Sequence, residues 1–118
     1  MPENDNSNEV INIKELNEIM DDDTELIHEC FVDFIQEWPK LYVEIKGAVL
    51  EKDTHKLDES SHKLKGTLRY LAAGAAADAA YALESAGKKN DLEGVEKKLL
   101  TLKNECQRLV DYINNFNQ

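Results

Sequence analysis

Residues 24–51 read TELIHECFVDFIQEWPKLYVEIKGAVLE, and their apolar side chains recur at intervals of three and four positions. This spacing predicts one long amphipathic helix, because an α-helix has about 3.6 residues per turn and gathers such positions on one face. Asp23 or Thr24 is suited to cap the first turn, where backbone N–H groups lack partners. Pro39 has no backbone N–H to donate, so we expect it to kink the helix or split it in two. The apolar face comprises Ile27, Cys30, Phe31, Phe34, Trp38, Leu41, Ile45 and Val49.

The same periodicity recurs along most of the remaining chain, whereas alternating patterns typical of β-strands are almost absent. Small residues in the alanine-rich segment 75–89 would let helix backbones approach closely, and Gly74 is expected to mark the break before it. Long amphipathic helices with short links form an antiparallel four-helix bundle, so we predict an all-α fold with a short extra N-terminal helix. The further helices are expected over residues 11–20, 54–72, 75–89 and 92–116, with Asp91 as the N-cap of the last.

The charge of the chain is unevenly distributed. The net charge is −10, yet residues 1–53 hold 15 acidic and 4 basic side chains, whereas residues 54–118 hold 9 acidic and 10 basic ones. Such an acidic balance disfavours nucleic acid and anionic membrane surfaces as partners. No apolar run approaches the roughly 20 residues that span a bilayer, and the polar N-terminus lacks the features of a signal peptide. We therefore expect a cytoplasmic protein with a disordered acidic lead over residues 1–9 and one domain over residues 10–118.

His62 lies in the segment SSHKLKG, inside a predicted helix. At about 100° per residue, His62 lies about 140° from Leu57, which belongs to the apolar stripe of that helix. Ser61 and Leu64 fall on the stripe itself. The imidazole is therefore expected to face solvent rather than the core.

Three neighbours of His62 are typical of a site for an anionic group. Lys65 and Arg69 follow one and two turns later, and we expect both to lie beside His62 on the outward side. Gly66 is unfavourable within a helix by about 1 kcal/mol relative to alanine, but its missing side chain would clear an approach to the ring. An exposed nucleophilic nitrogen with cations nearby suits acceptance of a phosphoryl group. A surface histidine without a chemical role is the alternative that these residues leave open.

Two E-x-x-H patterns raise a different possibility, a di-iron carboxylate centre inside a helical bundle. They pair Glu25 with His28 and Glu59 with His62. The ligands of such a centre must project into the bundle, whereas the helical spacing directs all four of these side chains outward. The two cysteines are far apart in the chain and offer no metal-binding pattern either. We therefore expect no metal site.

The segment SSHKLKG resembles the H-x-L-K-G signature of histidine-containing phosphotransfer (HPt) domains. Residues 23–66 are similar to the long second helix of that family, with its proline, and to its acidic turn and active helix. Residues 82–109 are similar to the next helix, turn and final helix. The resemblance implies a helical bundle that takes a phosphoryl group from the aspartate of a receiver domain and passes it to another receiver in a multistep two-component phosphorelay.

Carried over by position, the resemblance implies specific roles around the histidine. His62 would be the phosphoacceptor, Lys65 the supporting cation and Gly66 the residue that leaves room for a partner. Glu84 follows His62 by 22 positions and matches a place where the family often has glutamine or another polar residue. It would hold the second ring nitrogen and set the tautomer.

The resemblance also implies a phosphoryl carrier without kinase activity of its own, rather than a stand-alone enzyme. The carrier would need no cofactor, because Mg²⁺ is expected on the partner receiver domain. A bundle of this size is expected to be a monomer. Tyr70 and Ala72 stand where the family often has a small residue and a glycine, a departure that bears on the choice of partner. The competing interpretation is a helical module that binds receivers without transferring phosphate.

Overall fold

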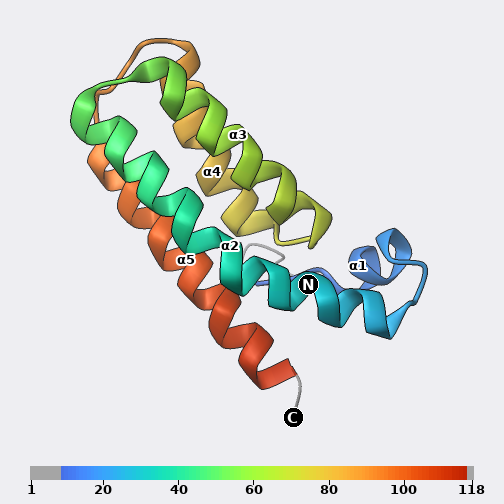
Figure 1. Cartoon of the computed structure of the whole chain (residues 1–118). Helices are drawn as coiled ribbons and strands as arrows, with labels where there is room; N and C mark the ends of the chain where they lie inside the picture. Colours follow the sequence, from blue (N-terminus) through green and yellow to red (C-terminus); the bar gives the residue numbers. More distant parts are fainter. Residues whose placement is uncertain (1–8, 117–118) are drawn as a thin grey trace.

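The computed structural model describes residues 9–116, and within this range the chain forms five α-helices and no β-strand. The four long helices run up and down beside one another, and the short first helix lies at one end (Figure 1). The predicted all-α bundle is confirmed, whereas the predicted disordered lead lies, except for Glu9, outside the described residues. Between residues 9 and 116 no helix has both the length and the apolar character that crossing a membrane requires. The helices are α1 (Ile13–Ile19), α2 (Thr24–Glu51), α3 (Thr54–Tyr70), α4 (Gly74–Lys88) and α5 (Val95–Phe116).

The start and the bend of α2 follow from two residues. The Asp23 side chain accepts a hydrogen bond from the backbone N–H of Leu26 at 3.0 Å, which satisfies one of the free donors of the first turn. Pro39 lies inside the helix, and the helix continues through it. Figure 1 shows that α2 changes direction near its middle. The missing N–H of the proline thus bends one continuous helix and does not split it.

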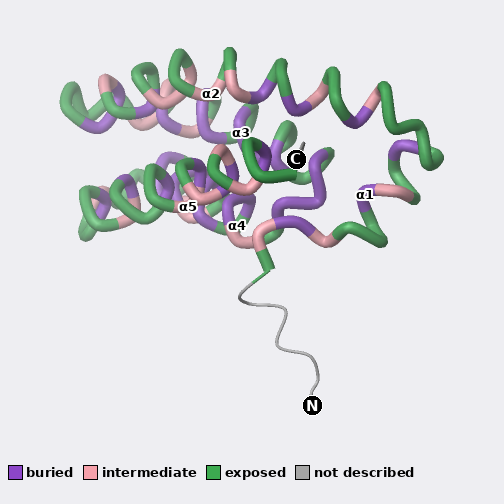
Figure 2. The backbone as a smooth tube through the Cα atoms, turned by 90° about the horizontal axis from the view of Figure 1, so that it is seen from below, coloured by how far each residue is buried: buried purple, intermediate pink, exposed green. Residues whose placement is uncertain are grey.

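The core lies between the four long helices, each of which packs against two others. The helix α3 contacts α2 and α4, and α5 contacts α4 and α2, which closes the bundle. In Figure 2 the buried segments lie on the sides of the helices that face one another. The helix α1 covers one end, where Leu16 and Met20 are almost fully buried and the N–H of Asn12 donates to the carbonyl of Ala72 at 2.9 Å.

The helices α3 and α4 are in close contact at Gly87. A Cβ atom at this position would lie 2.7 Å from the backbone nitrogen of Asp58 and 2.7 Å from the carbonyl oxygen of Thr54. Only glycine permits this approach, because carbon atoms do not come so near to backbone atoms. The alanine-rich helix α4 therefore packs closely against α3, as the sequence predicts. The contact at Gly87 fixes the alignment of the two helices near the first turns of α3.

Two predicted boundaries are wrong in detail. The last helix begins at Val95, because Gly94 has a φ of +69° and interrupts the helical path. Asp91 accepts from the N–H of Glu93 at 3.1 Å and so stabilises the preceding turn. Gly74 is the first residue of α4, and the chain reverses instead at Ala72, whose φ is +56°.

Candidate functional site

His62 lies on the exposed side of α3, a helix that Asp53 caps by accepting from the N–H of Lys56. The imidazole side chain is 66% exposed, whereas its neighbours Ser61 and Leu64 are fully buried. This alternation is what the helical spacing predicts. The position of His62 around the helix axis thus directs its ring toward solvent. The helix α3 that carries it is capped and well packed.

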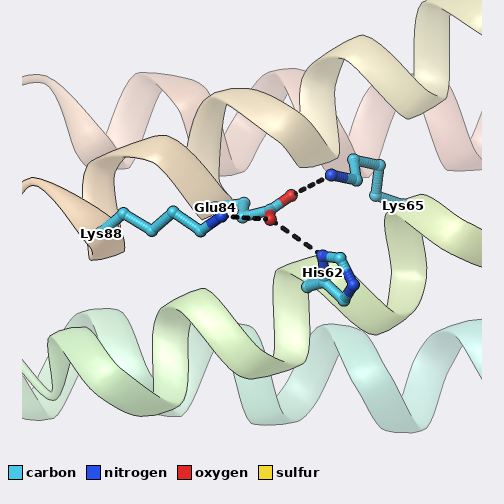
Figure 3. Close-up of polar contacts among 4 residues, drawn as sticks. All are labelled: His62, Lys65, Glu84 and Lys88. Atoms are coloured by element: carbon cyan, nitrogen blue, oxygen red, sulfur yellow. Dashed lines mark hydrogen bonds and ion pairs between the residues drawn. The ribbon is translucent and has the colours of Figure 1, made fainter.

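A hydrogen bond joins His62 to α4. The Nδ1 atom of His62 lies 2.9 Å from Oε2 of Glu84, and Figure 3 shows the other ring nitrogen pointing away from this carboxylate. An ionised carboxylate only accepts hydrogen bonds, so Nδ1 carries the proton in this contact. The contact therefore assigns the tautomer, which leaves Nε2 of the neutral ring with a free lone pair toward solvent.

Glu84 is the buried centre of the site, with only 1% of its side chain exposed. Burial raises the pKa of its carboxyl group, but hydrogen bonds from Lys65, His62 and Lys88 outweigh that effect and lower the pKa from 4.5 to about 2. The carboxylate is therefore ionised at neutral pH even though it is buried. Its charge is compensated from three directions, as Figure 3 shows.

The helical spacing predicts that Lys65 lies on the outward side of α3 with its side chain free. The structure contradicts this prediction. Its side chain is only 11% exposed, and its Nζ atom lies 2.6 Å from Oε1 of Glu84. The ammonium group also lies 5.2 Å from the ring centroid of Tyr81, within cation–π distance. Because Gly87 lets α4 pack tightly against α3, residues at the edge of the outward side of α3 become covered. Lys65 thus contacts Glu84 and Tyr81 in the interface between the two helices.

Lys88 belongs to the cluster although the sequence interpretation did not include it. Its Nζ atom lies 3.3 Å from Oε2 of Glu84, the same oxygen that His62 contacts, and its side chain is 60% exposed. The two residues are four positions apart on α4, a spacing at which Glu and Lys side chains meet. This spacing is visible in the sequence and could have identified Lys88 once Glu84 was assigned to the site.

Gly66 and Arg69 remain on the exposed side of α3. A Cβ atom at Gly66 would meet nothing within 4 Å, so the space beside His62 is open. Arg69 lies exposed in the last turn of the helix, and its side chain makes no hydrogen bond or ion pair with Glu84 or with another residue between 9 and 116. The structure therefore gathers His62 and Lys65 around Glu84, while Arg69 stands apart.

A groove open to solvent runs beside His62 between α2, α3 and α4. Its lining includes Glu44 of α2, His62 and Lys63 of α3, and Glu84 and Lys88 of α4. The groove thus brings an exposed ring nitrogen, exposed cations and a buried anion within reach of one incoming group.

The E-x-x-H residues do not form an internal site. Glu25, His28, Glu59 and His62 are all exposed, which contradicts the inward geometry of a di-iron centre. Across the described range, no three or more histidine, cysteine or acidic side chains are grouped so that they could hold a metal ion.

Comparison with known proteins identifies the family of this chain but no individual relative. No curated protein matches it, and no solved structure does. The sequence model of the Hpt domain matches residues 29–112, a range that spans α3 with His62, α4 with Glu84 and most of α2 and α5. The match covers well over half of the chain, which therefore belongs to the Hpt domain family.

Proposed function

We propose that this chain is a phosphorelay carrier that accepts a phosphoryl group on Nε2 of His62 from the aspartate of one receiver domain and delivers it to another. The observation that carries the proposal is the bond between the exposed His62 ring and the buried Glu84 carboxylate. It leaves the outer nitrogen nucleophilic and directed toward a partner. The family to which the chain belongs is consistent with this role.

Glu84 supports the transfer by compensating charge. When Nε2 forms a bond to phosphorus, the ring retains its Nδ1 proton and becomes an imidazolium. The hydrogen bond to the ionised Glu84 carboxylate then joins two opposite charges, and hydrogen bonds to charged groups contribute about 1.5–3 kcal/mol. On the return path the ring leaves as a neutral imidazole, with its proton still directed at Glu84. One contact therefore assists both directions of a reversible relay.

The surface around His62 suits a large protein partner. Gly66 places no side chain beside the ring, so a receiver can bring its aspartyl phosphate close to Nε2. Arg69 is exposed two turns later and offers a positive charge to an acidic receiver site. The receiver supplies Mg²⁺, which neutralises the charge of the transferring group. We place this carrier in the cytoplasm as a monomer, without kinase activity of its own.

The decisive experiment is transfer from a radiolabelled receiver in the presence of Mg²⁺. We expect label on the full chain and none on His62→Gln, which keeps the fold because His62 is exposed. Transfer that survives in His62→Gln would contradict the proposal. Binding of the receiver without any transfer of label would favour the competing interpretation, a module that only docks receivers.

A further inference from the structure

The two lysines on Glu84 differ in how freely they can move. Lys65 is 11% exposed, and its Nζ atom lies 2.6 Å from Oε1 of the carboxylate. Lys88 is 60% exposed, and its Nζ atom lies 3.3 Å from Oε2. Figure 3 shows the two ammonium groups approaching the carboxylate from opposite sides. The shorter contact is therefore buried between the helices, and the longer one is open to solvent.

The groove beside His62 is accessible to only one of these two lysines. Lys88 lines it together with His62 and Glu84, whereas Lys65 does not. Lys88 and His62 also share one oxygen of Glu84, so the ammonium group and the ring are neighbours. A lysine has a flexible four-carbon stem, and an exposed one can turn toward a new anion without disturbing the core.

Moving Lys65 toward the same anion would be unfavourable. Its departure would take away the ammonium group that contacts Oε1 of Glu84, an oxygen buried between the helices. Leaving a buried charge without its partner strongly destabilises a protein. When Lys88 leaves, by contrast, Oε2 of Glu84 keeps its hydrogen bond with His62, and the ammonium group that departs is already 60% exposed. The energetic balance thus favours a stationary Lys65 and a mobile Lys88.

We propose that Lys88 is the cation that contacts the phosphoryl group on Nε2 of His62, and that Lys65 is a positioning residue that holds Glu84. The proposal rests on the proposed function of His62. After transfer, Glu84 keeps its contacts with the Nδ1 proton and with Lys65, and Lys88 exchanges its longer contact for a phosphoryl oxygen. Positive charge from an ammonium group then stabilises the phosphoryl dianion.

The test uses potassium phosphoramidate as the donor, so that no receiver is needed. Nε2 of His62 forms the new bond to phosphorus, the phosphorus–nitrogen bond of the donor breaks, and ammonia leaves. Four variants of the whole chain are compared with the wild type: Lys88→Ala, Lys88→Arg, Lys65→Ala and Lys89→Ala. Lys89 is the matched control, because it is exposed, adjacent in sequence and absent from the lining of the groove. Thermal unfolding of each variant verifies the fold.

For Lys88→Ala we expect phosphohistidine to hydrolyse about threefold faster or more, and the phosphoryl pKa to rise by roughly half a unit in ³¹P NMR titrations. Lys88→Arg should restore both values, and Lys89→Ala should match the wild type. Lys65→Ala should instead alter the ¹⁵N signals of the unphosphorylated His62 ring, because Glu84 is no longer held.

Three outcomes would overturn the proposal, and they can be told apart. If the wild type acquires label on His62 but Lys88→Ala has an unchanged lifetime and an unchanged phosphoryl pKa, Lys88 is not the contacting cation. If those two values change in Lys65→Ala instead, Lys65 makes the contact. If the wild type acquires a phosphoryl group on His62 neither from phosphoramidate nor from the labelled receiver, the proposed function fails and this inference fails with it.

Discussion

His62 and Glu84 are 22 positions apart in the sequence, yet Nδ1 of the exposed ring lies 2.9 Å from Oε2 of the buried carboxylate. The two residues come from α3 and α4, which Gly87 brings into backbone contact one turn away from the site. The negative charge of Glu84 therefore lies beside Nδ1 of the His62 ring, while the opposite side of the ring faces solvent. We expect this contact to govern the tautomer of the ring, the rate of the proposed transfer and the response of stability to acid.

Replacing Glu84 by glutamine should slow phosphoryl transfer without removing it. The amide oxygen can still accept from Nδ1–H, but it brings no charge to balance the imidazolium. The loss of a charge-assisted bond corresponds to about 1.5–3 kcal/mol, or on the order of 10- to 100-fold in rate. Rapid-quench measurement with a labelled receiver checks this. Equal rates for Glu84→Gln and the wild type would show that the charge of Glu84 plays no part.

The stability of the domain should fall in acid because of Glu84. Its folded-state pKa of about 2 is depressed below the ordinary 4.5, so its contribution is present above about pH 4.5 and lost as pH falls toward 2. A shift of this size corresponds to about 3 kcal/mol. Urea unfolding at a series of pH values should show the wild type losing its advantage over Glu84→Gln as pH falls through this window. A difference in the free energy of unfolding between the two proteins that stays constant from about pH 4.5 down to 2 would contradict the lowered pKa of Glu84.

Substitutions at Gly66 should separate access by a protein from access by a small molecule. Gly66→Ala should stabilise the helix by about 1 kcal/mol, since a Cβ there meets no other atom. Gly66→Arg should fold equally well but project a long side chain beside His62. We expect receiver-dependent labelling to fall at least tenfold in Gly66→Arg while labelling by phosphoramidate stays near that of the wild type. A parallel loss with both donors would instead indicate damage to His62 itself.

Helical periodicity alone predicts much of this site, because it determines which side of a helix a residue occupies. It correctly placed His62 outside and Ser61 inside. It failed for Lys65, which lies at the edge of the outward side of α3. Whether such an edge is covered depends on how closely the next helix packs, and the sequence of α3 contains no information on that distance. The proximity of Glu84 to His62 was inferred from the family resemblance and has no local signal in either helix.

Gly87→Ala should disturb the contact between His62 and Glu84, although Gly87 touches neither side chain. This prediction tests whether the close approach of α4 to α3 at Gly87 positions Glu84. The new methyl group would collide with backbone atoms of Thr54 and Asp58, which cannot rotate away as a side chain can. The helix α4 must therefore shift, at a cost of about 1–3 kcal/mol. Glu84 moves with it, so the preference of His62 for the Nδ1–H tautomer should decline in ¹⁵N NMR spectra.

Gly47→Ala is the matched control for this substitution, because Gly47 also lies within a long helix but a Cβ atom there would have no neighbour within 4 Å. It should raise the free energy of unfolding by up to about 1 kcal/mol and leave the His62 signals unchanged, since alanine is the better helix former. The opposite signs of the two effects would separate close packing from helix propensity. If Gly87→Ala were as stable as Gly47→Ala and kept the wild-type tautomer, backbone contact between α3 and α4 would not be what positions Glu84.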